Sequence, residues 1–488
     1  MAHEITMYND LSPKNYLLHL LTVYPYDIEQ ELVLTLLQEH PQTNVSLTHF
    51  LEYFAHYPKF HLITKAYKKE TLSSLYTNMS LTFQTNKTNL HTHLFQFDAT
   101  IFMKQYPIKT PYAHLPLNQI PFLEKLHLHT VPILPMTTPY KPFPIIKSKN
   151  FLYRNLSIDA QDFFAVSIRI CDKNGIVYVP KKQFRMGIAL ASLYEIVPPP
   201  TNIDFYLLYG VAHQETTYAY YYDETNNVYI GLISGSSTLH NFAYLKDMIT
   251  TLYNSLCIEK HDLPVHGSML QLHFHDKTIG LLLVGESGTG KSEIMDALTY
   301  MCDKRNIAYT KVFDDSGILH YLDNDVYATG TQIGAYVSID DLPKQRVYEN
   351  LASSVFLKVE KQTTHILLPY TTFTQTCKFH KVDSMIYLNN YDKKQGIQYL
   401  HDLIEAKTLF KGGYYRTKQH KLQTSFFCNP YGCVQQQDTL EPLIDDFLNL
   451  MLINNTKLAT LYTRPLHCSK DTLYTRLAKI LLKEILDW

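Results

Sequence analysis

The stretch that decides the fold is Gly285-Glu286-Ser287-Gly288-Thr289-Gly290-Lys291-Ser292. It fits the phosphate-binding loop pattern G-x-x-x-x-G-K-[ST], whose glycines let successive backbone N–H groups point at one anion. The pattern places Lys291 where it can reach the outer phosphates of a nucleotide, and the Ser292 hydroxyl where it can bind Mg²⁺. We therefore predict that residues 285–292 bind a nucleotide or another phosphoanhydride.

The flanking sequence provides the strand and the helix that such a loop requires. Residues 278–284 form a short apolar run that ends at Gly285, as expected for a buried strand. After the loop, apolar residues recur with helical spacing at Ile294, Ala297, Leu298 and Met301. This order places a helix N-terminus, with its partial positive charge, behind the bound phosphates.

Composition limits the classes of protein to which the chain can belong. Its 488 residues indicate two or three domains, and 45% hydrophobic with 18% charged residues is typical of globular proteins. The net charge of −1 provides no basic surface field for nucleic acid or an anionic membrane. The sequence contains no apolar run of membrane-spanning length, so we expect neither nucleic acid nor a membrane as a partner.

Cysteine usage and the N-terminus indicate the compartment. The seven cysteines are odd in number and widely scattered, which favours reduced thiols over a disulfide framework. Residues 1–6 lack the basic and apolar parts of a signal peptide. We therefore expect a cytoplasmic protein.

The sequence predicts an α/β protein with mixed sheets, and it divides into three parts. Residues 1–145 are predicted to be partly helical, mainly over 28–105, and to end in a proline-rich connector over 107–144. Residues 146–260 form a mixed α/β domain, and residues 261–488 form the nucleotide-binding domain. Alternating residues predict strands at 165–170, 175–179, 205–209 and 228–233. Apolar periodicity predicts helices at 240–256, 392–410, 440–452 and 471–486.

A second chemical feature is the acidic pair Asp314-Asp315, which follows the apolar residues Val312 and Phe313. A phosphate-loop enzyme needs an acid on a nearby strand to hold Mg²⁺ or to accept the proton of the attacking hydroxyl. Two adjacent carboxylates can divide these tasks. We predict that Asp315, with Ser292, holds Mg²⁺ and that Asp314 is the base, although the two aspartates can exchange roles.

Together these features resemble the phosphoenolpyruvate carboxykinase and HPr kinase superfamily. The loop is similar to the G-x-S-G-x-G-K-[ST] loop of both families, and Glu293 after it resembles HPr kinase. The acidic pair resembles the paired aspartates of both families. Further similarity to carboxykinases lies in residues 264–268, in the glycine-rich stretch 330–336, and in residues 411–418 and 425–428. The resemblance covers about 200–430.

The resemblance implies a carboxykinase-like C-terminal phosphate-loop domain behind an N-terminal α/β domain. It also implies a second metal site, with Mn²⁺ held by His266 and by Lys246, which lies at the spacing of that family's metal-binding lysine. Imidazole and carboxylate both suit Mn²⁺, whereas a lysine ligand must be neutral.

The sequence departs from the carboxykinases where they hold a dicarboxylate substrate. Residues 363–369 contain no arginine, although the family has one there, and Ser338 and Ser316 replace the expected lysine and acidic residue. Without a guanidinium group, a carboxylate loses its paired charge-assisted hydrogen bonds. Arg185 and Arg416 are candidate replacements.

Three functions follow from these observations. The first is a metal-dependent kinase that moves a phosphoryl group from ATP, GTP or pyrophosphate to a hydroxyl of a small molecule or protein. Lys291, Asp314 and Asp315 are its catalytic residues. The second is a carboxykinase that converts oxaloacetate and ATP to phosphoenolpyruvate, CO₂ and ADP. The third is a regulatory protein that binds a nucleotide without turnover.

Overall fold

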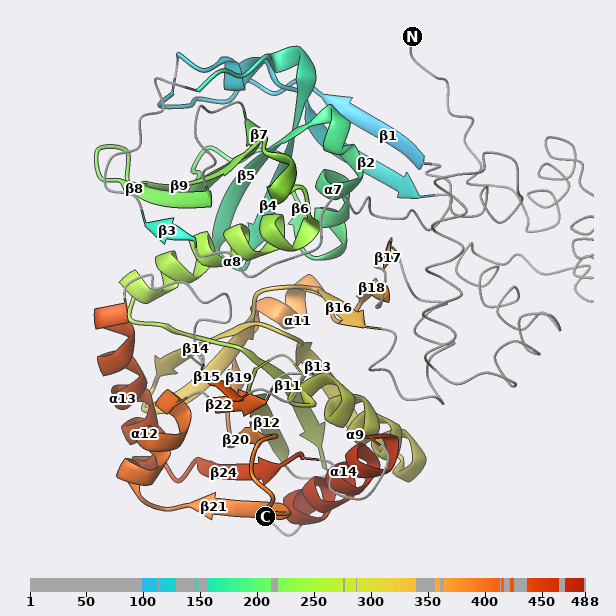
Figure 1. The fold of residues 1–488 in the computed structure, drawn as a ribbon, viewed down its shortest axis with the longest axis vertical. Helices are drawn as coiled ribbons and strands as arrows, with labels where there is room; N and C mark the ends of the chain where they lie inside the picture. Colours follow the sequence, from blue (N-terminus) through green and yellow to red (C-terminus); the bar gives the residue numbers. More distant parts are fainter. Residues whose placement is uncertain are drawn as a thin grey trace, which may run out of the picture.

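We describe the fold from a computed structural model of the chain (Figure 1). It describes residues 99–486 except 113, 129–144, 148–155, 212–217, 275–276, 287, 339–355, 360–363, 413, 417–421, 425–436 and 465–469. The predicted helices before residue 99 and the loop residue Ser287 lie outside this range. Within it, none of the helices combines the length and apolar character needed to cross a membrane.

The N-terminal half of the described chain, β1 to β9 with α7 and α8, is built on one mixed sheet. Its strands run in the order β1-β2-β4-β5-β7-β9-β8-β3, with β6 paired to β4. Their bounds are Ala99–Lys104, Phe122–Leu128, Ile146–Lys147, Phe163–Ile170, Lys173–Pro180, Glu195–Ile196, Phe205–Val211, Tyr218–Asp223 and Val228–Ser234 for β1 to β9. Strands β1 and β2, from before residue 145, therefore extend the same sheet.

Two α-helices and several short 3-10 turns complete this half. Helix α7 spans Phe184–Ala189, and α8 spans Phe242–Glu259 after an N-cap hydrogen bond from Ala243 N–H to the Asn241 side chain. The 3-10 turns are Pro116–Gln119, Ala160–Asp162, Lys181–Gln183, Leu190–Ser192 and Ser237–Leu239. Helix α8 packs on β7 and β9 and lies between this sheet and the rest of the protein (Figure 1).

The C-terminal half, β10 to β24 with α9 to α14, is centred on a six-stranded sheet in the order β13-β11-β12-β20-β24-β21. These strands span Ala308–Phe313, Gly267–His273, Thr278–Val284, Ser384–Asn389, Lys457–Tyr462 and Gly396–Leu400. Alternate residues of β12 face opposite layers: Leu281 and Leu283 pack with α9 and α14, whereas Leu282 and Val284 pack with α12 and α13. The result is a three-layer α/β/α arrangement.

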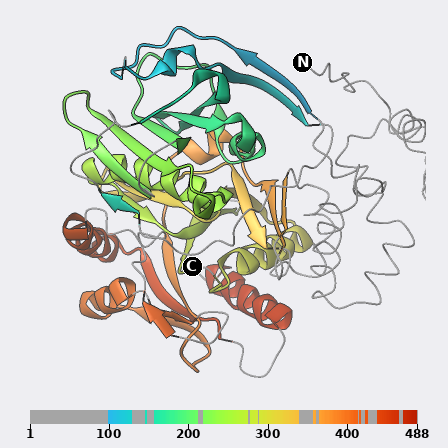
Figure 2. The same cartoon turned by 45° about the horizontal axis from the view of Figure 1, so that its top comes forward.

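The helices of these layers pair side by side. Helices α9 (Lys291–Arg305) and α14 (Lys470–Leu486) contact each other, as do α12 (Leu403–Gly412) and α13 (Gln437–Ile453). Both ribbon views show α9 beside α14 (Figure 2). The chain therefore covers each face of the central sheet with one pair of helices.

Smaller sheets and one short helix surround this core. A four-stranded sheet has the order β10-β14-β15-β19 and spans Leu263–Val265, Gly317–Leu322, Asp325–Gly330 and His380–Lys381. A three-stranded sheet has the order β16-β18-β17, at Gly334–Ser338, Thr364–Pro369 and Phe356–Val359. Strands β22 (Tyr414–Arg416) and β23 (Leu422–Thr424) form a hairpin, and α11 spans Phe373–Cys377.

The mixed α/β class is confirmed, and most predicted elements in the described range are present. The predicted helix over 392–410 is wrong in its first half, because residues 396–400 form β21, which pairs with β24. Of residues 28–105, predicted to be mixed but mainly helical, the structure describes only 99–105, and these include β1. The domain boundaries near 145 and 260 stay predictions.

Candidate active site

The order of strands in the six-stranded sheet brings three segments together at one end of its strands. Strand β11 lies between β12 and β13 and is antiparallel to both, with Gly267 opposite Val284 and Met269 opposite Phe313. The start of β11 therefore lies beside the ends of β12 and β13. His266, just before β11, therefore lies at the same end of the sheet as the residues that follow β12 and β13.

The predicted phosphate-binding loop follows β12 and leads into α9, which begins at Lys291. Its glycines take positive φ values of 153° at Gly285, 82° at Gly288 and 104° at Gly290. Only glycine adopts these values without strain. A Cβ atom on Gly290 would also lie 2.6 Å from Cε1 of Tyr474, so the loop passes directly beneath that ring. The Thr289 hydroxyl donates a hydrogen bond of 2.7 Å to the Glu286 carbonyl and closes the turn.

Lys291 is buried inside the loop. Its Nζ donates hydrogen bonds to the carbonyl oxygens of Gly285 at 2.6 Å and Glu286 at 3.2 Å. It also lies 3.2 Å from Nε2 of His266. Burial lowers the pKa of Lys291 below its ordinary value, although the nearby carboxylates oppose this effect. Lys291 thus lies at the end of the strands where the other candidate residues also meet.

Asp314, directly after β13, is a buried carboxylate held by two serine hydroxyls. Ser268 on β11 donates a hydrogen bond to its Oδ1, and Ser292 on α9 donates another to the same atom at 3.1 Å. Burial raises the pKa of Asp314 above its ordinary value, and the two serine hydrogen bonds only partly offset that rise. Ser292 was predicted to act with Asp315, whereas its hydroxyl contacts Asp314.

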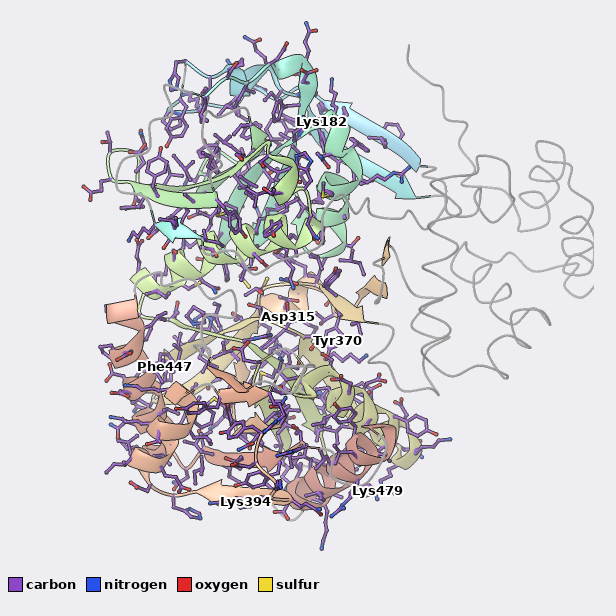
Figure 3. All side chains as sticks on the ribbon, viewed as in Figure 1. Lys182, Asp315, Tyr370, Lys394, Phe447 and Lys479 are labelled. Carbon is purple, nitrogen blue, oxygen red and sulfur yellow. The ribbon has the colours of Figure 1, made fainter. Side chains whose placement is uncertain are left out.

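Asp315 faces the other way, toward α8. It has a φ of +81°, an uncommon conformation for a residue with a side chain, and such residues cluster at functional sites. Its carboxylate forms an ion pair with Lys246 and lies 3.1 Å from Nε2 of His266. Figure 3 shows Asp315 on the side of the C-terminal half that faces α8. The structure therefore brings the predicted Lys246, His266 and Asp315 into contact.

These contacts set the charge states of the cluster. Burial alone would raise the pKa of Asp315, but Lys246 and His266 outweigh it and hold that pKa well below the ordinary range. Burial lowers the pKa of Lys246, but Asp315 outweighs it, so the lysine pKa lies above its ordinary value. Lys246 is thus a protonated cation and Asp315 an anion at neutral pH.

The side chains around the two aspartates differ in whether they can bind a metal ion. The Ser292 hydroxyl and the Asp314 carboxylate are oxygen donors 3.1 Å apart, which fits the preference of Mg²⁺ for oxygen ligands. Lys246 does not fit a metal site in this arrangement, because a protonated amine has no lone pair to donate. Within the described ranges, no group of three or more His, Cys, Asp or Glu residues is arranged as a metal site.

Three further polar residues lie near these groups, and only one of them, Glu286 in the loop, was predicted as a binding residue. Ser268 contacts Asp314, and the buried Glu286 carboxylate lies 3.7 Å from Nδ1 of His266. The Gln332 side chain is 1% exposed, and neither end has a hydrogen-bond partner among the residues that the structure describes. Glu286 belongs to the loop motif, and Ser268 and Gln332 lie in the carboxykinase-like stretches 264–268 and 330–336, where neither residue was singled out.

The other candidates lie in different surroundings. Arg416 is on β22. Its backbone N–H donates a hydrogen bond to the Asn390 side chain, and the amide nitrogen of Asn390 lies 3.5 Å from the Gly288 carbonyl oxygen. Arg185 is on α7 in the N-terminal half.

Comparisons with known proteins show a distant likeness among solved structures. No protein-family model matches the chain, and no curated protein matches it. Among solved structures, the chain is similar to the HPr(Ser) kinase/phosphatase from Coxiella burnetii at 16% identity. The alignment covers 46% of this chain and 97% of that chain, with a TM-score of 0.20. A likeness of this size does not establish a family.

Proposed function

We propose that the protein is a metal-dependent phosphotransferase that moves a phosphoryl group from ATP, or another phosphoanhydride, to a hydroxyl group of a small molecule or protein. The observation that supports this proposal most strongly is the Ser292–Asp314 contact at the start of α9, directly behind a phosphate-binding loop. A hydroxyl and a carboxylate at this position are what a nucleotide-bound Mg²⁺ requires.

The loop and Lys291 would bind and polarise the donor. The backbone N–H groups of residues 285–292 and the N-terminus of α9 would surround the phosphates. The Lys291 ammonium, now bonded to loop carbonyls, would turn to the transferred group and stabilise the charge that develops on it. Because burial removes water around Lys291, each contact of its ammonium group with phosphate oxygen is strengthened.

Ser292 and Asp314 would hold Mg²⁺, which supplies neutralisation of phosphate charge when it is bound. Ser268 would keep the Asp314 carboxylate oriented. A cation beside Asp314 would keep this carboxylate ionised despite its raised pKa. This assignment exchanges the roles of the two aspartates relative to the sequence prediction, an exchange that the sequence left open.

Asp315 would then accept the proton of the acceptor hydroxyl. Its side chain is 28% exposed, whereas Asp314 is almost fully buried, so an acceptor that arrives from outside can reach Asp315 more readily. The depressed pKa of Asp315 keeps it in the proton-accepting form at neutral pH. Lys246 and His266 would orient the carboxylate and limit its motion.

The carboxykinase alternative draws support from one observation, the convergence of Lys246, His266 and Asp315. The carboxykinase resemblance implies that Lys246 and His266 lie at one site, and both side chains contact Asp315. The weakness of this alternative is unchanged, because residues 363–369 contain no arginine for a dicarboxylate.

One experiment distinguishes these functions. The purified chain would be incubated with labelled ATP, GTP or pyrophosphate and Mg²⁺ or Mn²⁺. The acceptors would be polyols, hydroxyl amino acids, cell-extract proteins and oxaloacetate. Transfer to a hydroxyl is the expected result. Phosphoenolpyruvate formation at an enzyme-like rate would instead establish the carboxykinase, and nucleotide binding without any transfer would favour a regulatory protein.

Two variants of one helix serve as test and control. Lys291→Ala is expected to slow transfer by ~10³-fold or more, the order of loss for a main charge-stabilising group. Lys304→Ala changes an exposed lysine at the far end of the same α9 and should leave the rate unchanged. Full activity in Lys291→Ala would show that the reaction takes place elsewhere.

A further inference from the structure

Two cysteines from different halves of the protein lie near each other. Cys171 is in the turn between β4 and β5, and Cys377 is the last residue of α11. The Cys171 Sγ lies 3.4 Å from the Gly330 carbonyl oxygen and 3.9 Å from that of Thr376, the residue before Cys377. Both cysteines are free thiols, and both residues are partly exposed.

Both sulfurs are carried by well-packed backbone. Cys171 has a φ of +49° at the end of a tight hairpin whose strands pair from Phe163–Pro180 to Ile170–Lys173. On the other side, Thr376 is buried, and its methyl group would lie 2.9 Å from a Cβ built on Gly330. Because neither segment has room to shift, the two thiols stay near each other.

The two side chains also share a hydrogen bond that makes them chemically unequal. This bond from Cys171 lowers the pKa of Cys377 below its ordinary value, although burial opposes the effect. The same bond, together with burial, raises the pKa of Cys171. Low-pKa, accessible cysteines beside a second thiol are those that oxidise most readily. Cys377 therefore has the properties of the attacking thiolate, and Cys171 those of its resolving partner.

We propose that Cys171 and Cys377 form a reversible disulfide that joins the two halves of the protein when it meets a hydroperoxide. The Cys377 thiolate attacks the hydroperoxide ROOH, breaks its O–O bond and becomes a sulfenic acid, while RO⁻ leaves and takes up a proton as ROH. The Cys171 sulfur then attacks the sulfenic sulfur, and water leaves. Two thiols and one ROOH thus give one disulfide, ROH and water. A dithiol reverses the reaction by exchange.

The position of this pair indicates what the bond would hold. Lys260, just after α8, lies 3.0 Å from Asp172, so the β4–β5 turn sits at the C-terminal end of that helix. Near the other end of α8, Lys246 pairs with Asp315. The disulfide would therefore add a covalent link between the halves near the C-terminal end of α8, whereas the ion pair lies near its N-terminal end.

The chain offers an internal control in Cys257. It lies on α8 near Cys171 but is buried, and burial raises the pKa of its thiol far above the ordinary value. A buried, protonated thiol reacts slowly with a hydroperoxide. Cys257→Ser therefore should not change the oxidation, whereas Cys171→Ser and Cys377→Ser should abolish the bridge.

The test uses the full chain, reduced and then exposed to hydrogen peroxide at pH 7, with free thiols blocked before peptide mass spectrometry. We expect one Cys171–Cys377 bridge and a melting temperature raised by ~5 °C or more, both reversed by dithiothreitol. In Cys171→Ser, a sulfenic-acid probe should label Cys377. No bridge, a bridge between other cysteines, or an unchanged melting temperature in the bridged protein would overturn the proposal. None of these measurements depends on phosphoryl transfer, so a failure of the disulfide proposal can be distinguished from a failure of the proposed function.

Discussion

Lys246 and Asp315 form an ion pair that connects the two halves of the protein across 69 positions of sequence. Lys246 is on α8, which packs on the nine-stranded sheet, and Asp315 follows β13 of the six-stranded sheet. The pair therefore couples the geometry of the candidate site to the packing of the two halves, and its loss should affect both activity and stability.

Lys246→Met should destabilise the fold by about 2 kcal/mol, below the cost of breaking a fully buried pair because Asp315 is partly exposed. The depressed pKa of Asp315 means that its contribution is present above its unfolded value of 3.8 and is lost as pH falls through the lower folded value. Urea unfolding of both proteins should therefore show a larger difference at pH 7 than at pH 3. Lys381→Met, which breaks the exposed Lys381–Asp325 pair, should cost at most about 0.5 kcal/mol. Equal effects of the two substitutions would contradict the prediction.

Substitutions of the two aspartates should change different kinetic parameters. Asp314→Asn is expected to raise the Mg²⁺ concentration needed for half-maximal transfer by ~10-fold or more, because a metal oxygen donor is lost. Asp315→Asn should lower kcat by ~10²-fold or more at unchanged Mg²⁺ dependence, as loss of a general base does. Asp325→Asn, on β15 away from the site, is the matched control. The opposite pattern in the two variants would restore the roles that the sequence first indicated.

Gly290→Ala should impair nucleotide binding more than its backbone strain alone explains. Its φ of 104° and the contact 2.6 Å from the Tyr474 ring both oppose a side chain. Gly396→Ala is a matched control, because Gly396 also has a positive φ, 84°, but no atom within 4 Å of the added Cβ. Both should lose about 1–2 kcal/mol of stability from φ strain. Calorimetric titration with nucleotide should show at least ~10-fold weaker binding, or ~1.4 kcal/mol, in Gly290→Ala only. Wild-type affinity in that variant would mean that the loop does not hold the phosphates.

Gln332→Met should stabilise the protein while it impairs catalysis. The buried Gln332 amide has no hydrogen-bond partner in the described part of the chain, so an apolar side chain of similar size should raise stability by about 1 kcal/mol. Gln332 follows Thr331, which is bonded to the Ser316 carbonyl next to Asp315, so we expect a higher KM for the acceptor. Thermal unfolding and acceptor titration measure the two effects. A loss of stability would show that the amide is satisfied within the fold.

Local sequence determined the loop and its flanks, because the requirements there are local. Residues 278–305 were predicted as strand, loop and helix, and they form β12, the loop and α9. Glycine torsions, a helix N-terminus and apolar periodicity depend on neighbours along the chain. The prediction failed at residues 396–400, because pairing with the distant β24 decided that they form a strand.

Tertiary structure alone decided how the chemical residues group. The sequence presents Asp314 and Asp315 as adjacent equals, and nothing in it states which one Ser292 contacts. Insertion of β11 between β12 and β13 brings Ser268 and Ser292 onto Asp314, while the positive φ of Asp315 turns its carboxylate toward Lys246 and His266. Residue types and spacing thus determined which groups are present. Long-range strand order and one backbone torsion, which no local pattern encodes, determined which of them touch.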